Sequence, residues 1–195
     1  MITDWGGIIS FPFISSNTVY PLTKDAVKEN NVNYRFFKKY HIVGWMKIFS
    51  EQMCNMYSAH IKNPMQTLIV RPGNIYGPYD KYTKKESKVI AALIRRIYEK
   101  QNPLEVWGDG KDVKDFIYID DFIDGLLKAF KNKAINGPIN LASGKSETIR
   151  KVINYLKIIS KQKKLKVNFI HDMPSMIPYR LISIDKAKKL INFKP

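Results

Sequence analysis

The chain of 195 residues has a single cysteine, Cys54, and no apolar run that approaches the roughly 20 residues needed to span a bilayer. One cysteine cannot form an internal disulfide, so the sequence does not belong to a disulfide-stabilised scaffold. No basic segment followed by an apolar segment opens the sequence, so no secretory signal is visible. These absences lead us to expect a soluble protein of the reducing cytoplasm.

Acidic residues are scarce, because 17 Asp and Glu stand against 33 Lys and Arg and leave a formal charge of +16. A charge of this sign attracts nucleic acid. Only six of the basic residues are arginines, however, and the 27 lysines are spread along the chain without an arginine-rich tract or an aromatic RNA-binding motif. We therefore do not expect nucleic acid as a partner, and the charge would also suit a diphosphate ligand. Because no apolar run could span a bilayer, we expect no membrane partner.

Buried apolar runs alternate with amphipathic segments along the chain, which predicts an α/β fold with a largely parallel sheet. The predicted strands are residues 8–15, 67–71, 104–107, 116–119, 138–142 and 165–170. The predicted helices are residues 44–60, 87–98, 120–130, 146–159 and 184–191. The length suits one domain, or one domain with a small lobe.

Several polar residues have a structural explanation in this pattern. Ser146 is predicted as the N-cap of the helix that follows it. Asp120 and Asp121 are predicted to cap the helix at 120–130 rather than to bind a metal as a pair. His60 and His171 have no companion Cys, His or carboxylate at ligand spacing. We expect no metal site.

Six motifs follow one another in a fixed order: SSNTVYP at 15–21, VGWMK at 43–47, RPGNIYGP at 71–78, GDGKDVKDFIYIDD at 108–121, NLASGKS at 140–146 and DKAKKLINFKP at 185–195. Together they resemble the extended short-chain dehydrogenase/reductase family. The resemblance is to its NAD-dependent epimerase/dehydratase members, of the GDP-L-fucose synthase-like or UDP-glucose 4-epimerase-like kind. Such proteins modify the sugar of a nucleotide-sugar.

The resemblance implies a partial Rossmann-like parallel sheet, with its N-terminal strands missing, and an interleaved smaller α/β substrate-binding lobe. Residues 1–80 would be the remnant of the dinucleotide-binding domain. Residues 81–195 would be mainly the substrate-binding lobe, with 116–142 returning to the Rossmann sheet. The glycine-rich G-x-x-G-x-x-G loop of the family is absent from the sequence. We therefore expect a truncated or split homologue, with an unpaired sheet edge beside the strand at 8–15.

The family's catalytic serine and lysine correspond to Ser16 and Lys47, but Val43 stands where the family has the proton-carrying tyrosine. A valine cannot transfer a proton. The resemblance also implies cofactor contacts at Lys47 and Pro72. The cofactor would be NAD or NADP, which we do not expect this chain to bind alone.

The resemblance implies a second set of residues, which would bind a nucleoside diphosphate sugar. They are Asn74, Val89, Leu93, Arg96, Trp107, Lys114 and Arg180. At Lys114 the family has an arginine that binds the diphosphate. A lysine keeps the charge but loses the planar guanidinium that matches a phosphate, so weaker and less directional binding is expected there.

Three interpretations follow from the sequence. The chain could be a truncated or split homologue with little autonomous catalysis. It could be part of an active epimerase or dehydratase once a further polypeptide supplies the missing half. Its protein partner would be that polypeptide or a second copy of the chain in a homodimer. It could also be a non-enzymatic interaction protein. Bound nicotinamide cofactor would argue against the first interpretation, and failure to bind any nucleoside diphosphate sugar would favour the third.

Overall fold

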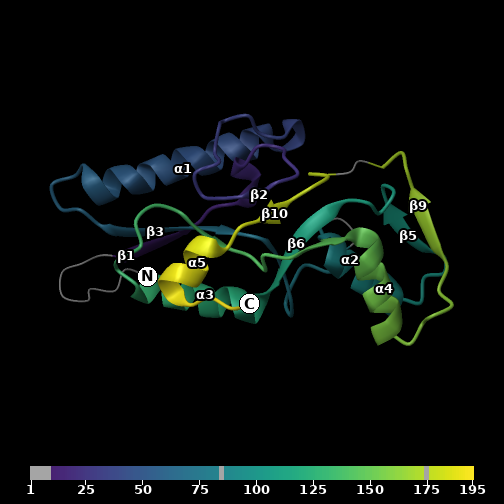
Figure 1. Cartoon of the computed structure of the whole chain (residues 1–195). Coiled ribbons are helices and arrows are strands. Elements are labelled where there is room, and N and C mark those ends of the chain that lie inside the picture. The colour runs from purple at the N-terminus through teal and green to yellow at the C-terminus, as the bar shows by residue number, and fades with distance from the viewer. Residues whose placement is uncertain (1–9, 84–85, 174–175) are drawn as a thin grey trace.

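Three parallel strands form the central sheet of the larger lobe in the computed structural model, which describes residues 10–83, 86–173 and 176–195 (Figure 1). The strand β1 (Ser10–Ile14) pairs with β3 (Gln66–Pro72), and β3 pairs with β7 (Ile139–Leu141). Among the described residues, the second edge of β1 has no strand partner. The α/β fold confirms the sequence-based prediction.

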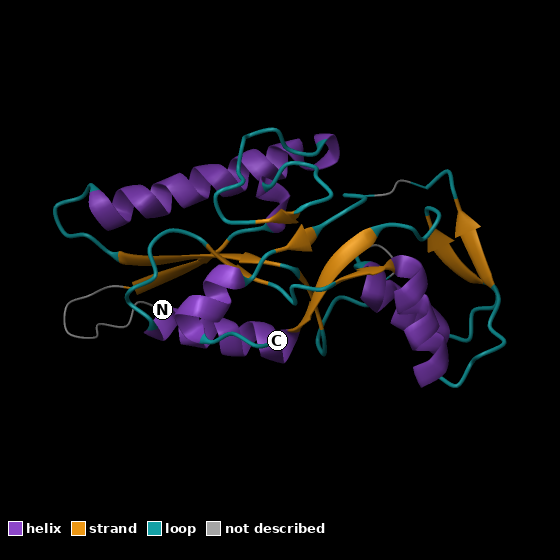
Figure 2. Cartoon of the chain, in the orientation of Figure 1, coloured by secondary structure: helices purple, strands orange, loops and turns teal. Residues whose placement is uncertain are grey.

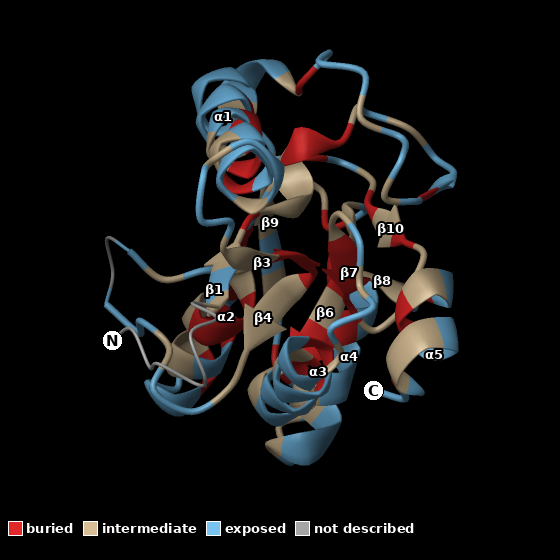
Figure 3. Cartoon of the chain, turned by 90° about the vertical axis from the view of Figure 1, so that its left-hand side faces the viewer, coloured by how far each residue is buried: buried red, intermediate tan, exposed pale blue. Residues whose placement is uncertain are grey.

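Helices cover both faces of this sheet (Figure 2). The long helix α1 (His41–Ala59) packs on one face against β3. On the other face lie α3 (Ile119–Lys131) and the short α5 (Asp185–Ile191), which packs against α3 and β7. A cluster of apolar residues fills the interior between these layers. Figure 3 shows the buried segments in red.

A smaller lobe contains a two-stranded parallel sheet and two helices with a hydrophobic core of their own (Figure 1). Its strands are β5 (Leu104–Trp107) and β9 (Val167–Ile170), and its helices are α2 (Val89–Tyr98) and α4 (Ile149–Ile159). The apolar residues of α2 and α4 recur at helical spacing, and their inner sides meet in this core.

A third sheet joins the two lobes. Its central strand β6 (Val113–Tyr118) pairs in parallel with β4 (Asn74–Tyr76) and antiparallel with β8 (Ser146–Thr148). The remaining elements are short: the 3-10 helices η1 (Asn17–Val19) and η2 (Lys38–Tyr40), and a two-stranded parallel pair of β2 (Ala26–Val27) with β10 (Leu181–Ile182).

Two details of the local prediction were wrong. The motif RPGNIYGP was expected to be a loop, but its residues 74–76 form β4. Ser146 does not cap α4, because it lies in β8; the N-cap is Thr148, whose side chain accepts a hydrogen bond from the backbone N–H of Lys151 at 3.2 Å. Both differences arise from pairing with β6, a strand distant in sequence from each.

A further difference concerns α3. Its N-cap residue is Tyr118, which makes no side-chain capping bond, and Asp120 and Asp121 lie in the first turn. Their charges still interact favourably with the helix N-terminus. The helix is confirmed, and the predicted side-chain cap is wrong.

The C-terminal segment returns to the larger lobe. Ile182, Ile184, Ala187 and Phe193 belong to the core under the central sheet, although the sequence analysis assigned residues 81–195 mainly to the smaller lobe. No helix in the described ranges combines the length and apolarity that crossing a membrane requires.

Candidate functional site

The carboxyl ends of the adjacent parallel strands β1 and β3 lead into loops that lie side by side. Ser16 follows β1 and is the N-cap of η1, where its hydroxyl accepts hydrogen bonds from the N–H and hydroxyl of Thr18 at 3.2 and 3.0 Å. The side-chain amide of Asn17 donates to the carbonyl of Pro72 at 2.9 Å, which fixes this loop to the end of β3. Ligands of open parallel sheets bind at such strand ends.

The helix α1 brings Lys47 to the same place. The Lys47 ammonium donates to the carbonyl of Ile14 at 2.9 Å, at the end of β1, and lies 5.1 Å from the ring centroid of Phe13. Val43 lies one helical turn earlier and is exposed. The structure thus brings Lys47 next to the segment that carries Ser16, with an apolar side chain in the adjacent turn of α1.

Lys47 and Pro72, which the family resemblance assigns to cofactor contacts, differ in what they could offer a dinucleotide. Lys47 has the position and charge to bind a ribose hydroxyl, whereas Pro72 is buried and its carbonyl already accepts from Asn17. No glycine-rich loop that could hold a pyrophosphate occurs in the sequence. The chain's residues therefore fit the nicotinamide end of the cofactor through Lys47 and do not fit its pyrophosphate.

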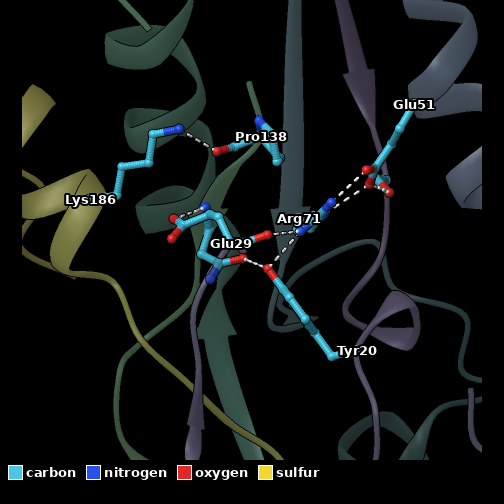
Figure 4. Close-up of polar contacts among 8 residues, drawn as sticks. Tyr20, Glu29, Glu51, Arg71, Pro138 and Lys186 are labelled. Atoms are coloured by element: carbon cyan, nitrogen blue, oxygen red, sulfur yellow. Dashed lines mark hydrogen bonds and ion pairs between the residues drawn. The ribbon is translucent and has the colours of Figure 1, made fainter. Parts of the chain in front are cut away.

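A buried ion pair lies beneath this site (Figure 4). The Arg71 guanidinium of β3 donates two hydrogen bonds to the Glu51 carboxylate of α1, at 2.9 and 2.6 Å, and both side chains are 4% exposed. The hydroxyl of Ser15 donates to the same carboxylate. Burial lowers the pKa of Arg71, but the hydrogen bonds to Glu51 and Tyr20 more than offset this, so the pKa is raised and the guanidinium stays charged.

The network continues to the core of the larger lobe. The Tyr20 hydroxyl accepts a hydrogen bond from Arg71 at 3.1 Å and donates to the side-chain oxygen of Asn140 at 2.6 Å. Burial raises the pKa of Tyr20 to about 12, so the phenol stays protonated and can donate. The Asn140 backbone N–H donates to the Glu29 carboxylate at 2.9 Å. This network joins α1, β3 and β7 through side-chain hydrogen bonds.

A second buried carboxylate supports the loop after β7. Asp115 of β6 accepts hydrogen bonds from the N–H and hydroxyl of Ser143, both at 2.8 Å, and from the Gly144 N–H at 3.0 Å. Burial raises the pKa of Asp115 to about 6, although these donors lower it. Gly73 passes close by: a Cβ on it would lie 3.1 Å from the Asp115 carboxylate, so only glycine fits without displacement.

Three of the predicted sugar-nucleotide contacts gather around β6. The Asn74 amide donates to the backbone carbonyl of Asp115 at 2.9 Å. Lys114 pairs with Asp112 at 3.1 Å and donates to the Ile177 carbonyl, and burial lowers its pKa. These bonds turn the Lys114 ammonium toward protein groups, so binding a phosphate requires its release.

Arg180, the third of these, is fully buried. Its guanidinium donates to the carbonyls of Pro21 and Tyr20 at 3.0 and 3.2 Å, while its Nε finds no partner among the described residues. Burial lowers the pKa of Arg180 to about 10. The geometry assigns Arg180 a structural contact with the loop after η1, and its ligand role stays a prediction.

The other four predicted contacts belong to the smaller lobe. Leu93 is 2% exposed and packs in the core of that lobe, so it offers no surface to a ligand in this conformation. The Arg96 guanidinium donates to the Glu105 carbonyl and ties α2 to β5. Val89 is half-buried, and Trp107, at the carboxyl end of β5, is 54% exposed. Trp107 is therefore the most accessible of the seven predicted contacts.

Sequence reasoning did not single out Glu51, Tyr20 or Asp115 as part of the site. Glu51 is a carboxylate on the inner side of α1, four residues after Lys47, and that spacing was the available signal. The contacts of Tyr20 reach Asn140 and Arg180, up to 160 positions away, which no local pattern reveals.

Comparisons with known proteins agree with this geometry. The family model of the NAD dependent epimerase/dehydratase family matches residues 5–142. The probable GDP-L-fucose synthase 1 of Oryza sativa subsp. japonica is 27% identical over 199 residues, which cover 97% of this chain and 58% of that protein. The UDP-glucuronate 4-epimerase of Thermodesulfobacterium geofontis is 32% identical over 140 residues, which cover 71% of this chain and 41% of that protein.

A solved structure shares the fold. The UDP-glucuronic acid 4-epimerase of Bacillus cereus, in complex with UDP-glucuronic acid and NAD, superposes with a TM-score of 0.80 and 28% identity over 95% of this chain and 56% of that one. The chain thus spans about half the length of the relatives it matches. Because the family model matches more than half of the chain, the chain belongs to the NAD-dependent epimerase/dehydratase family of extended short-chain dehydrogenases/reductases.

Proposed function

We propose that this chain binds a nucleoside diphosphate sugar between the carboxyl ends of its central sheet and the smaller lobe, with little catalysis of its own. The observation that carries this proposal is Val43, which lies one turn before Lys47 on α1 in an otherwise ordered site. Lys47 can position a ribose or a sugar hydroxyl, but a valine cannot take up its proton. The missing glycine-rich loop supports the same conclusion for cofactor binding.

The substrate class follows from residues that can face a ligand. Trp107 offers an exposed aromatic side chain, and Asn74 lies beside β6, where its amide donates to the Asp115 carbonyl. The net positive charge of the chain favours a diphosphate over a neutral sugar. The Bacillus cereus relative binds UDP-glucuronic acid, and we propose a ligand of that class here.

Isothermal titration calorimetry tests this proposal with UDP-glucuronic acid, UDP-glucose, GDP-L-fucose and NAD as separate ligands. We expect saturable binding of at least one nucleotide-sugar, no stoichiometric binding of NAD, and no product after long incubation with both. Stoichiometric NAD carried through purification would contradict the proposal. If none of the nucleotide-sugars binds, the non-enzymatic interaction protein becomes the favoured interpretation.

A second candidate function, an active enzyme completed by a further polypeptide segment, is supported by the surface beside β1. Among the described residues, one edge of β1 has no strand partner, and the same lobe exposes an apolar side of α1 that includes Ile42, Met46 and Phe49. A segment that adds a strand to β1 and covers this side of α1 would remove both from solvent. A second copy of the chain is the alternative occupant.

This candidate can be tested by extending the chain at its N-terminus with the part of the Bacillus cereus epimerase that it does not cover. We expect the extended protein to bind NAD and to require Val43→Tyr for turnover. Equal turnover with Val43 and with tyrosine at this position would show that position 43 is not catalytic. Absence of NAD binding by the soluble, folded fusion would count against the second candidate.

A further inference from the structure

One end of the smaller lobe exposes large apolar side chains. Tyr98, the last residue of α2, is 86% exposed, and Ile158 and Ile159, which end α4, are 61% and 76% exposed. The core of the lobe is already filled by other residues of the same helices, so these three side chains have no packing role inside it. Apolar side chains grouped on one surface are typical of an interaction site.

Hydrogen bonds hold the C-terminal ends of α2 and α4 together. The Gln162 side chain, just after α4, donates to the Ile97 carbonyl in α2 at 3.2 Å. The segments that precede β5 and β9 are joined as well, because the Leu104 N–H donates to the Lys166 carbonyl at 2.8 Å. The exposed apolar residues therefore belong to one ordered surface.

This surface lies at the end of the lobe opposite the candidate ligand site. The parallel strands β5 and β9 begin here, at Leu104 and Val167, and end at Trp107 and Ile170 (Figure 1). A partner bound at this end would leave Trp107 accessible to a ligand.

The same surface is strongly basic. From the last turn of α4 onward, residues 157–171 contain five lysines and no Asp or Glu. Exposed lysines surround the apolar group; they are Lys100, Lys161, Lys163, Lys164 and Lys166. The nearby carboxylate of Glu99 is neutralised by Arg95 at 3.2 Å. We call this surface, formed by these five lysines with Tyr98, Ile158 and Ile159, the basic tip.

The backbone at the basic tip is well hydrogen-bonded. After α4, the N–H groups of Ser160, Lys161 and Gln162 donate to carbonyls of the last turn at 2.9, 3.1 and 3.0 Å. After α2, the N–H groups of Lys100 and Gln101 do the same at 3.1 and 2.9 Å. Moving these helix ends into a medium of low polarity therefore costs less free energy than it would if their backbone groups were unpaired.

We propose that the basic tip docks onto the surface of an anionic lipid bilayer. Aliphatic and tyrosine side chains can enter the region between headgroups and acyl chains, while surrounding lysines contact the anionic headgroups. The aliphatic pair, and a set of charges made of lysines, favour a bilayer over nucleic acid, which arginine and stacking aromatics recognise. This proposal departs from the sequence-based expectation of no membrane partner, which addressed only spanning segments.

Co-sedimentation with lipid vesicles tests the proposal. The chain binds vesicles of phosphatidylcholine with about 30% phosphatidylserine, and binds pure phosphatidylcholine at least about tenfold more weakly. The triple variant K161Q/K163Q/K164Q loses roughly 100-fold in affinity for the anionic vesicles, and Ile158→Ser with Ile159→Ser loses about tenfold. Circular dichroism and thermal melting verify that both variants remain folded.

Matched controls separate the basic tip from the overall charge and apolarity of the chain. The variant K62Q/K131Q/K133Q removes three exposed lysines of the larger lobe, and Met46→Ser with Phe49→Ser removes two exposed apolar side chains of α1. We expect both controls to keep their vesicle affinity within about twofold. Charges farther than about 10 Å from the bilayer are screened by salt, and the two apolar side chains of α1 lie outside the basic tip.

Equal losses in tip and control variants would overturn the proposal, as would equal binding to neutral and anionic vesicles. Duplex DNA and polyglutamate serve as competitor polyanions at physiological salt. Tighter binding of either one than of the anionic vesicles, with the same dependence on the basic tip, would replace the bilayer by a nucleic acid or an acidic protein.

Discussion

The Arg71 guanidinium donates two hydrogen bonds to the Glu51 carboxylate, and this ion pair joins the central strand β3 to the helix that carries Lys47. The pair is buried, and the Glu51 carboxylate also accepts from Ser15, the residue before Ser16. The framework that positions the site is therefore polar, although the core on either side of it is apolar.

Glu51→Ala leaves the Arg71 charge buried without its carboxylate, and we expect it to lower the free energy of unfolding by about 3–5 kcal/mol. Glu86→Ala is the matched control, because it breaks an ion pair with Lys81 in which both side chains are exposed. Glu86→Ala is expected to lower the free energy of unfolding by less than about 1 kcal/mol. Urea unfolding of the three proteins measures both changes. Similar small effects would show that the buried pair does not support the fold.

Asp115 predicts a specific dependence of stability on pH. Its pKa is raised to about 6 in the folded protein, above its value of 3.8 in the unfolded chain. Between about pH 4 and pH 6 the folded state therefore binds more protons, so the Asp115 contribution to stability is fully present at low pH and is lost as pH rises through this window. The loss amounts to about 3 kcal/mol and levels off above about pH 6.

Asp115→Asn removes this titration, so its difference in unfolding free energy from the wild-type chain should change with pH in that window. Urea unfolding at about pH 4 and about pH 7 measures the difference. A difference that stays constant between the two conditions would show that burial does not dominate the titration of Asp115.

Val43→Tyr tests how much a proton carrier alone can restore. Residue 43 is exposed, so we expect a tyrosine to be accommodated with a change in stability within about 0.5 kcal/mol. We expect unchanged nucleotide-sugar affinity and no NADH formation at added NAD, because the sequence lacks the loop that holds the pyrophosphate. An absorbance signal from NADH with this variant would contradict the proposed function.

Trp107 and Tyr98, exposed aromatic residues at opposite ends of the smaller lobe, should have separate roles. Trp107→Ala is expected to weaken nucleotide-sugar binding by about tenfold and to leave vesicle binding unchanged. Tyr98→Ala is expected to weaken vesicle binding and to leave nucleotide-sugar binding unchanged. Calorimetry and co-sedimentation on both variants measure the four effects. Loss of both activities in either variant would indicate general damage to the lobe.

The sequence predicted the fold well where apolar periodicity was strong. The strand at 67–71 and the helices at 44–60 and 87–98 are present as β3, α1 and α2, with ends shifted by a few residues. The strand β4 was missed because its residues 74–76 form a strand only through their pairing with β6, more than 40 residues later. Pairing across such a distance leaves no signal in the local pattern.

Side-chain environments were less predictable than elements. Arg180 reads as an available cation in the sequence, but its burial depends on carbonyls of Tyr20 and Pro21 about 160 positions earlier. The helix α1 was predicted from apolar spacing, yet Phe49 faces outward while Glu51 faces the core. The buried partner that Glu51 needs, Arg71, lies on a different strand, and only the fold brings the two together.

Titration calorimetry of the chain with UDP-glucuronic acid, UDP-glucose and GDP-L-fucose, with product analysis of the same samples after incubation with NAD, tests the central claim most directly. The proposed function predicts saturable binding of at least one nucleotide-sugar that Trp107→Ala weakens, and no converted sugar. Turnover by the chain alone, or no binding of any nucleotide-sugar by the folded chain, would contradict it.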